Sequence, residues 1–572
     1  MNKRKLFFIY LSIVIFSLII RFWRVQTIPP VISHDESFYP VQAKTLSVNG
    51  HGLNGIWKPS SLTAEVELYA ELPGLIMMPA AKLLPNQPIL AAKITHIILG
   101  TAIIFILSAL AFALTKQHSF AIFTALIASV NPWLFQFSRM GFDSMFSLFF
   151  YLTALLIFIK AKNWHKIWAF PIFFLGFFQY QGLKVIFLPI VFIASFYNWQ
   201  KKENSWPTLI VLIVSILLFV FYLQSLRFQT SGNRLNFLIF NDHEYINQQV
   251  NLNRQQSLNN PWKNLYSNKL TVVGLRFVEQ YINSLDLKQW FFSLDVVRNP
   301  FAVYQHGLFY PQDLFLIVLG LIFLWQKKSQ QKMAFLLTCL LLIAPLPAAI
   351  VSTGNWLVFR VSFLVPIYIL LIAFAINQIA KKWPRSIFLG VIIIYFLFTT
   401  RFFYEYFYRY PILGTRDQYF SEKIIAQYIK RNPKKNIIII APEPIFVFNE
   451  ILIFNNLINQ KNIDSINKSF QTKNYQLENF QILGERCIPN NIDKNTIYIS
   501  HSNVRPCDES NDFLLDYTQI PSLIDGGGVY RIYQDSYCGD LNLARFPNLQ
   551  NNVFALNKLS QEDFCKNFII RN

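Results

Sequence analysis

Charged residues are scarce in this chain. Asp, Glu, Lys and Arg make up 14% of its 572 residues, whereas about 25% is usual for a soluble domain. Apolar residues reach 53% and aromatic residues 17%. This composition excludes a disordered chain, a collagen, a coiled coil and a small disulfide-linked scaffold, and it indicates a membrane protein.

Short catalytic motifs are also missing. The sequence has no GxSxG, HExxH or Walker sequence. The glycine-rich DGGG (525–528) lacks the strand–GxxxxGK–helix setting of a phosphate loop, so it is interpreted as a hairpin turn. The chemistry must therefore be sought in residues that are far apart in the sequence.

Acidic residues are few where the chain is most apolar. The net charge is +20, yet residues 411–572 hold 17 Lys and Arg against 17 Asp and Glu, so the excess lies in residues 1–410. A charge of +20 alone could suggest nucleic acid. Its confinement to the hydrophobic part indicates membrane topology instead, with no nucleic-acid partner.

Long apolar runs predict the architecture. A helix needs about 20 mainly apolar residues to cross a bilayer. We predict eleven spans, at about 6–23, 91–114, 119–137, 142–160, 167–180, 183–199, 208–226, 311–326, 333–351, 359–379 and 386–400. The Pro-flanked 72–84 is too short and is interpreted as an interfacial or re-entrant segment.

Cations in the short loops set the orientation, because they favour the cytoplasmic side. With the N-terminus inside, the inner loops hold Lys3, Arg4, Lys5, Lys116, Lys160, Lys162, Lys166, Lys201, Lys202, Lys327, Lys328, Lys332, Lys381, Lys382 and Arg385. The short outer turns hold only Arg139. We predict a multi-pass protein of the plasma (inner) membrane with a cytoplasmic N-terminus, an uncleaved first span and an extracytoplasmic C-terminal domain.

The chain then divides into two domains. Residues 1–410 form the transmembrane domain, with outer loops at 24–90 and 227–310. Residues 411–572 form an extracytoplasmic α/β domain, with a helix at 418–431 and strands at 436–442 and 495–500. Segments 515–523 and 529–533 are expected to form a hairpin across DGGG.

Cysteine is rare, and its placement fits an oxidising compartment. Cys339 lies alone in a span, and four cysteines lie in the C-terminal domain. Four cysteines allow three pairings, of which we favour the sequential one, Cys487–Cys507 and Cys538–Cys565. A zinc site is the alternative, but the CxxC spacing typical of such sites is missing.

Charges close to the membrane are costly and often functional. The predicted topology puts seven on the outer face: Asp35, Glu36, Arg139, Asp143, Lys184, His306 and Arg360. Carboxylates can accept a proton from an attacking hydroxyl or bind a divalent cation. Arg and Lys can neutralise a lipid phosphate as it leaves. Together they favour group transfer from a phosphorylated lipid.

Each residue also has a purely structural interpretation. The pair Asp35–Glu36 could cap a helix that starts near Ser37. Arg139 and Asp143, four apart, could pair on one helix face. Lys184 and Arg360 could be interfacial anchors, and His306 a packed loop histidine. The sequence leaves these alternatives open.

The ordered set resembles a known superfamily. One anchor helix, an outer acidic pair and FSRMGFDSMFSLFFYL are followed by GFFQYQGLKVIFLPI, YQHGLFYPQDLFLIVLGL, PLPAAIVSTGNWLVFRVSFLVP and FFYEYFYRYP. Over about residues 1–432 this resembles the GT-C polytopic glycosyltransferases, within them the protein mannosyltransferase and lipid A aminoarabinose transferase group.

The resemblance implies a polyprenyl-phosphate sugar as donor and a lipid, glycan or protein as acceptor. Asp35 matches the acidic residue proposed as base or acceptor binder, with Glu36 beside it and Asp143 as the second acidic site. Lys184, Arg360, Arg139 and His306 match positions near the lipid phosphate. Glu36, Asp143 and His306 would hold the one expected cofactor, a divalent Mg, Mn or Zn ion.

The sequence departs from the group in places. It lacks an ETPP-like segment, for which YAELPGL (69–75) is the nearest match, and this leaves donor and acceptor open. It lacks WWDxG, which argues against an oligosaccharyltransferase. A transporter or flippase of a lipid-linked saccharide is the main alternative, although transporters more often carry polar groups at mid-bilayer. A scaffold is the third, but eleven spans exceed what anchoring needs.

Overall fold

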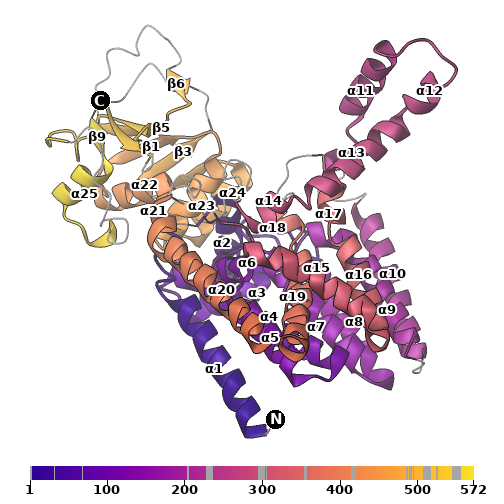
Figure 1. Ribbon diagram of the computed structural model, residues 1–572. Coiled ribbons are helices and arrows are strands. Elements are labelled where there is room, and N and C mark those ends of the chain that lie inside the picture. Colours follow the sequence, from indigo (N-terminus) through magenta and orange to yellow (C-terminus); the bar gives the residue numbers. More distant parts are fainter. Residues whose placement is uncertain are drawn as a thin grey trace.

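The computed structural model comprises a bundle of apolar helices and a mixed α/β domain at the C-terminus (Figure 1). The N-terminus of the first helix lies at the end of the bundle away from the α/β domain. The structure describes residues 3–30, 32–66, 69–201, 205–226, 236–293, 303, 306–352, 357–413, 420–484, 487–488, 493, 495–506, 517–522, 526–543 and 556–571.

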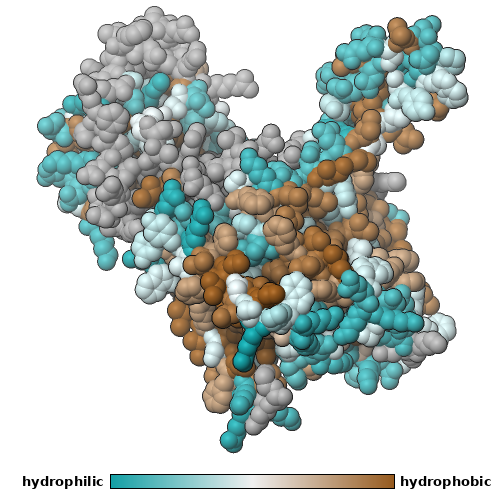
Figure 2. Space-filling view, viewed as in Figure 1, coloured by the Kyte–Doolittle hydropathy of each residue, from teal (hydrophilic) through white to brown (hydrophobic). Residues whose placement is uncertain are grey.

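Among the residues that the structure describes, seven helical segments are long and apolar enough to cross a membrane. They are α1 (Lys3–Phe22), α4 (Pro88–Thr115), Gly182–Trp199 with η3 (Gly182–Ile186) and α9 (Phe187–Trp199), α10 (Trp206–Leu226), Lys328–Ala349 with α16 (Gln331–Ile343) and α17 (Leu346–Ala349), α19 (Leu364–Lys382), and Arg385–Leu413 with α20 (Arg385–Tyr404). Apolar residues cover much of the bundle surface in Figure 2. The predicted polytopic helical fold is confirmed.

The remaining expected spans are also helical but shorter. They contain α5 (His118–Val130), α6 (Pro132–Phe137), α7 (Ser144–Lys160), α8 (Ala169–Phe177) and α15 (Pro311–Gln326). The segment 119–137 divides at Pro132, because proline cannot donate the hydrogen bond that would continue α5. The number of crossings, eleven, therefore stays a prediction.

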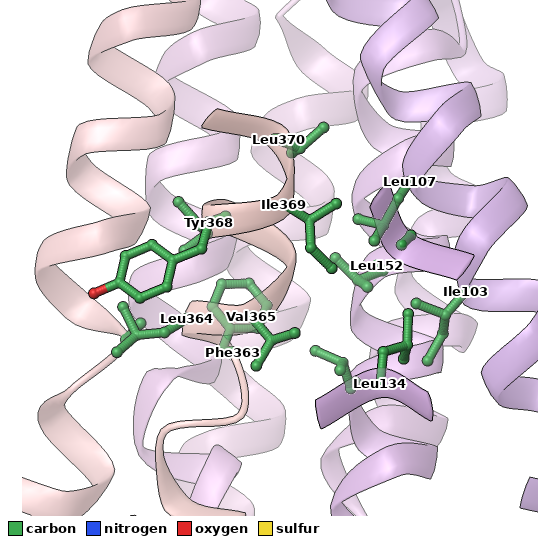
Figure 3. Packing of buried hydrophobic residues seen from close by; sticks show 14 of the residues in the cluster. Ile103, Leu107, Leu134, Leu152, Phe363, Leu364, Val365, Tyr368, Ile369 and Leu370 are labelled. Carbon is green, nitrogen blue, oxygen red and sulfur yellow. The ribbon is translucent and has the colours of Figure 1, made fainter. Parts of the chain in front are cut away.

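The bundle core is built around α19. Every residue of α19 from Leu364 to Ile379 is buried. Its Ile369 side chain points toward Leu107 of α4 and Leu152 of α7, whereas Tyr368 points to the opposite side (Figure 3). A helix that is apolar on all sides is buried on all sides, so α19 is the central helix of the domain.

Two helices between α1 and α4 lie on top of the bundle. Helix α2 (His34–Asn49) starts with a capping box of Ser33 and Glu36 and ends at Gly50 in the left-handed conformation. Helix α3 (Pro73–Leu83) has 11 residues and packs between α2 and α4. It is much shorter than a bilayer crossing of about 20 residues requires, which agrees with its interpretation as a non-spanning segment.

The C-terminal domain has a seven-stranded sheet in the order β2-β3-β1-β5-β8-β7-β9. Strand β1 pairs in parallel with β3 and β5, and the other ladders are antiparallel. The strands are β1 (Asn436–Ile440), β2 (Tyr475–Leu477), β3 (Phe480–Leu483), β5 (Thr496–His501), β7 (Tyr517–Pro521), β8 (Gly528–Tyr533) and β9 (Ile570–Arg571). The expected β7–β8 hairpin is confirmed.

Four helices flank the sheet: α22 (Phe420–Arg431), α23 (Pro444–Phe454), α24 (Ile463–Thr472) and α25 (Gln561–Phe568). The predicted disulfide Cys538–Cys565 is confirmed, with its Cα atoms 5.5 Å apart. Cys487, in the short pair β4 (Cys487–Ile488) and β6 (Arg505–Pro506), is disulfide-bonded. Its predicted partner Cys507 lies outside the described residues.

Two features rise from the same end of the bundle (Figure 1). The α/β domain packs on α2, where Phe38 and Val41 share one apolar core with Ile424 and Phe448. A helical arm projects beside it and contains α11 (His243–Gln255), α12 (Lys263–Tyr266) and α13 (Lys269–Asn283). The first turn of α2 therefore lies where the bundle and the α/β domain meet.

Candidate functional site

Glu36 holds the start of α2 against the bundle. Its carboxylate accepts hydrogen bonds from the Ser33 backbone and hydroxyl, both at 3.0 Å, and from the Gly141 backbone. The side chain is 1% exposed. Burial raises the pKa of this carboxyl, although the nearby Lys93 and the three hydrogen bonds act in the opposite direction. Glu36 is thus a helix cap that fixes α2 to the loop before α7.

Asp143 meets α2 one turn further on. Its Oδ2 accepts a 2.7 Å hydrogen bond from Tyr39 Oη, and Tyr39 Oη accepts one from the Ala70 backbone at 2.8 Å. Residues four apart share a helix face, so Asp35 lies one turn from Tyr39 on that face. Asp35 itself is exposed. The structure thus joins the acidic pair and Asp143 through two contacts.

Arg360 approaches the same loop from the opposite wall. It ends the short helix α18 (Leu357–Arg360), and its neighbour Phe359 packs on Phe142 with ring centroids 4.2 Å apart. The guanidinium also interacts electrostatically with Tyr180. Phe142 precedes Asp143 in the chain, so α18 packs on the loop that leads to Asp143. Arg360 itself is part-exposed.

The Lys184 ammonium is already paired with a carboxylate, that of Glu71. Its Nζ lies 2.6 Å from Glu71 Oε1, and both side chains are buried. Gln181 also donates to Glu71, at 2.9 Å, and the Lys184 ammonium lies 4.1 Å from the Tyr222 ring centre. A lipid phosphate would have to displace Glu71, so this geometry makes Lys184 part of the wall of the site.

Arg139 does not pair with Asp143 as one structural interpretation expected. It lies in the turn between α6 and α7, so the two residues do not share a helix face. The fully buried guanidinium donates to the carbonyls of Ile20, Arg21, Trp23 and Ile28 at 2.7–2.9 Å. It holds the end of α1, where a lipid phosphate has no access.

His306 is a packed loop histidine. Its Nδ1 hydrogen bonds to the Gly307 carbonyl at 2.8 Å, and its ring lies edge-to-face against Phe402 and Tyr310. Burial lowers its pKa to about 4. None of its described contacts joins it to Asp35, Glu36 or Asp143, so the phosphate-binding role expected for it gains no support from the geometry.

The expected metal ligands do not form a cluster. Glu36 is saturated by hydrogen bonds, Asp143 is bonded to Tyr39, and His306 packs among aromatic rings. Within the described part of the chain, no three His, Cys, Asp or Glu residues are grouped so that they could hold a metal ion. The set Glu36, Asp143 and His306 therefore does not fit a metal, and no step below depends on one.

A cavity of about 480 Å³ opens beside His34, at the carboxyl ends of β1 and β5. The chain leaves β1 toward β3 and then crosses to β5, so these ends form the topological switch point where open α/β sheets bind ligands. The lining includes His34, Glu422, Glu443, His501 and Tyr530. His34 belongs to α2, so both domains contribute to the cavity.

His34 is surrounded by carboxylates. Its Nδ1 lies 3.6 Å from Glu443 and its Nε2 lies 3.7 Å from Glu450. Burial raises the pKa of Glu450 well above its usual value, helped by the charges of Glu422 and Glu36. The hydrogen bond from His34 lowers the pKa of Glu443. The wall is thus acidic and suits a neutral or cationic ligand.

Asp35 stands at the edge of this acidic wall. Although its side chain is exposed, the surrounding protein raises its pKa; His34 opposes this effect and Glu443 adds to it. A carboxylate with a raised pKa is a stronger base than an ordinary one. Asp35 is thus an exposed carboxylate next to His34, which lines the cavity.

Sequence reasoning missed several of these residues: Tyr39, Glu71, Tyr180, Glu422, Glu443 and Glu450. Tyr39 could have been found, because it follows Asp35 by one helical turn. Glu71 lies in YAELPGL, which the analysis noted for a different reason. The three C-terminal glutamates follow no local pattern that points to α2.

Comparisons with known proteins give similarity to solved structures alone. No family model and no curated protein matches the chain. ArnT from Cupriavidus metallidurans bound to undecaprenyl phosphate is similar with a TM-score of 0.48 and 10% identity, over 92% of this chain and 97% of that one.

Two structures of an archaeal oligosaccharyltransferase are similar as well. AglB from Archaeoglobus fulgidus, with an inhibitory peptide and a dolichol-phosphate, gives a TM-score of 0.47 and 12% identity over 94% of this chain and 75% of that one. The A. fulgidus enzyme tethered to an acceptor peptide gives 0.44 and 12% over 79% of this chain. The chain spans 63% of the length of that enzyme.

Proposed function

We propose that the protein is a membrane glycosyltransferase. It would move a sugar from a polyprenyl-phosphate carrier to an acceptor hydroxyl on the extracytoplasmic side, with inversion at the anomeric carbon. The observation that carries the proposal is a set of three contacts. Glu36 and Gly141 are hydrogen-bonded, Tyr39 and Asp143 are hydrogen-bonded, and the rings of Phe359 and Phe142 pack together. These contacts join the chain segments that carry Asp35, Asp143 and Arg360, which supports the proposal that the three side chains act together.

Asp35 is the proposed base. It takes the proton of the acceptor hydroxyl while that oxygen attacks the anomeric carbon. The bond from this carbon to the phosphate oxygen breaks on the opposite face, so polyprenyl phosphate leaves as the new glycosidic bond forms. A positioned base of this kind typically accelerates a reaction by about 10²–10⁴-fold.

Asp143 and Arg360 have supporting roles in this mechanism. Tyr39 orients Asp143, which is within reach to hydrogen bond a sugar hydroxyl and to stabilise positive charge that develops at the anomeric carbon. Arg360 pairs with the phosphate, because a guanidinium binds phosphate oxygens in a forked geometry. Lys184 and Arg139, held by Glu71 and by backbone carbonyls, shape the site and hold its walls.

The acidic cavity is the proposed acceptor entrance. A polyprenyl phosphate is an anion, and Glu422 and Glu443 would repel it from this side. The donor must then enter from the bundle, and the acceptor from the α/β domain. This division explains why the cavity contains residues of both domains.

Reconstitution tests the function directly. The purified protein in liposomes is given polyprenyl-phosphate sugars and an extract of cell-envelope acceptors, and released polyprenyl phosphate is measured together with any glycosylated product. We expect both in equal amounts, with the anomeric configuration inverted. Movement of the intact lipid-linked sugar across the bilayer, without either product, would show a flippase instead.

Mass spectrometry of lipid that co-purifies with the protein identifies the donor. A polyprenyl phosphate or its sugar ester is expected. Its binding should weaken in Arg360→Gln and persist in Lys328→Gln, whose lysine lies at the other end of the bundle.

A further inference from the structure

The helical arm leaves an unusual amount of apolar surface exposed. Its small core consists of Ile246, Val250 and Val272, where α11 packs on α13. On the other side Leu270 is 81%, Tyr266 71% and Leu275 70% exposed, and Leu258, Trp262, Leu265, Val278 and Ile282 are more than half exposed. Soluble surfaces rarely leave contiguous apolar patches of this kind without a partner.

Three of these residues form an apolar stripe along α13. Leu275, Val278 and Ile282 follow one another at spacings of three and four, so they lie on one face of the helix. The turn before α13 adds the aromatic side chains of Trp262 and Tyr266. Trp and Tyr are the residues enriched where protein meets the lipid headgroups.

The charged residues in the outer part of the arm are all basic. Between residues 245 and 278 the sequence has no Asp or Glu, but it has Arg254, Lys263, Lys269 and Arg276. Arg276 is paired with Asp242 at 2.9 Å near the base. The outer part of the arm therefore carries net positive charge next to its apolar stripe, which is the pattern of helices that lie in a membrane interface.

The base of the arm is continuous with the spanning bundle. Tyr281 Oη donates to the carbonyl of Leu342, and Leu342, near the end of α16, is itself 57% exposed. Arg276 donates to the Ser352 carbonyl. Apolar surface extends from the bundle onto the base of the arm in Figure 2. The stripe thus starts where the lipid-facing surface of the bundle ends.

We propose that the arm, residues 237–293, lies on the outer leaflet of the same membrane and binds anionic lipid headgroups. Its apolar stripe enters the interface, and Lys263 and Lys269 pair with lipid phosphates. The inference is independent of the glycosyltransferase proposal, because the arm contains none of the residues assigned to that reaction.

Photo-crosslinking tests the proposal in the full-length protein. Benzoylphenylalanine replaces either Leu270, which is exposed in the first turn of α13, or, as a matched control, the exposed Gln248 on α11. Single copies are placed in nanodiscs of phosphatidylcholine with an equal amount of phosphatidylglycerol, irradiated, and analysed for lipid adducts by mass spectrometry. We expect a several-fold higher lipid adduct yield at Leu270 than at Gln248.

A charge-reversal variant tests whether Lys263 and Lys269 contribute to the binding of anionic lipid. Lys263→Glu combined with Lys269→Glu should lower the phosphatidylglycerol adduct at Leu270 and leave the yield in pure phosphatidylcholine discs unchanged. Equal lipid yields at Leu270 and Gln248 would overturn the proposal. In discs that hold two copies of the protein, an adduct between position 270 and the second copy, found in place of the lipid adduct, would also overturn the proposal.

Discussion

At the residue scale, the two halves of the acidic pair have different roles. Glu36 is buried and accepts three hydrogen bonds, whereas the adjacent Asp35 is exposed beside the cavity. One residue along a helix rotates the side chain by about 100°, which is enough to bury one carboxylate and expose the other. Glu36 thus takes the capping role, and Asp35 remains available for the catalytic role that we propose for it.

Tyr39 is predicted to position Asp143. Tyr39→Phe removes a hydrogen bond to a carboxylate, worth about 1.5–3 kcal/mol, so transfer should slow by about tenfold or more, since 1.4 kcal/mol corresponds to tenfold. The maximal rate should fall while the acceptor KM stays similar, because Tyr39 touches no substrate. Tyr404→Phe, at an exposed site, is the control, and an unchanged rate in Tyr39→Phe would refute the role.

Glu450 is predicted to make stability depend on pH. Its pKa is raised in the folded state, so the folded protein holds this proton more tightly than the unfolded chain. Stability from this group is present at low pH and is lost as pH rises above the unfolded value of about 4.3. Glu450→Gln should therefore raise the melting temperature more at pH 8 than at pH 5. Exposed Glu562→Gln should show no such trend, and an equal shift at both pH values would contradict the prediction.

At the element scale, local sequence patterns predicted much of the fold. The apolar runs correctly predicted the helices. The acidic pair indicated a helix that starts near Ser37, and α2 starts three residues earlier, at His34. The strands 436–442 and 495–500 and the hairpin across DGGG also agree with the structure. Each of these signals depends on residues a few positions apart, which is the range over which helix and strand periodicity acts.

The site itself could be predicted only in part. Asp35, Asp143 and Arg360 were identified because charges near a membrane are conspicuous. Their partners were not, since Tyr39 and Asp143 are 104 positions apart and Lys184 and Glu71 are 113 apart. The i,i+4 pairing of Arg139 with Asp143 failed because the chain breaks its helix between them.

The Lys184–Glu71 pair is predicted to tie η3 to the segment before α3. Lys184→Met leaves a buried carboxylate without its partner, which typically costs about 3–5 kcal/mol. The double variant Lys184→Met/Glu71→Gln should recover much of this loss in denaturation experiments. Lys566→Met breaks an exposed pair with Glu562 and should change stability far less, because water screens surface ion pairs. A double variant no more stable than Lys184→Met would argue against the pair.

At the scale of the whole molecule, the proposed reaction would separate its two substrates. The apolar carrier would approach from the lipid-facing helices, and the acceptor would approach from the acidic cavity of the α/β domain. The first turn of α2 lies between them and carries the exposed Asp35. This arrangement requires the α/β domain, the arm and Asp35 to face the same compartment.

Orientation is predicted from the cation distribution. In a Cys339→Ser background, Lys430→Cys on the α/β domain should react with a membrane-impermeant maleimide in intact cells. Lys328→Cys, in a loop expected on the cytoplasmic side, should react only after the membrane is opened. Both lysines are exposed. The two thiols are therefore equally accessible in the folded protein, and only the membrane distinguishes them. The opposite labelling pattern would invert the topology and remove the extracytoplasmic assignment.

Single-turnover transfer by Asp35→Asn in proteoliposomes tests the central claim most directly. Asparagine keeps the size of the side chain but cannot accept the proton, so we predict a loss of about 10²–10⁴-fold with the donor lipid still bound. Asp464→Asn, at an exposed position on α24, should transfer at the full rate. Full transfer by Asp35→Asn would contradict the account.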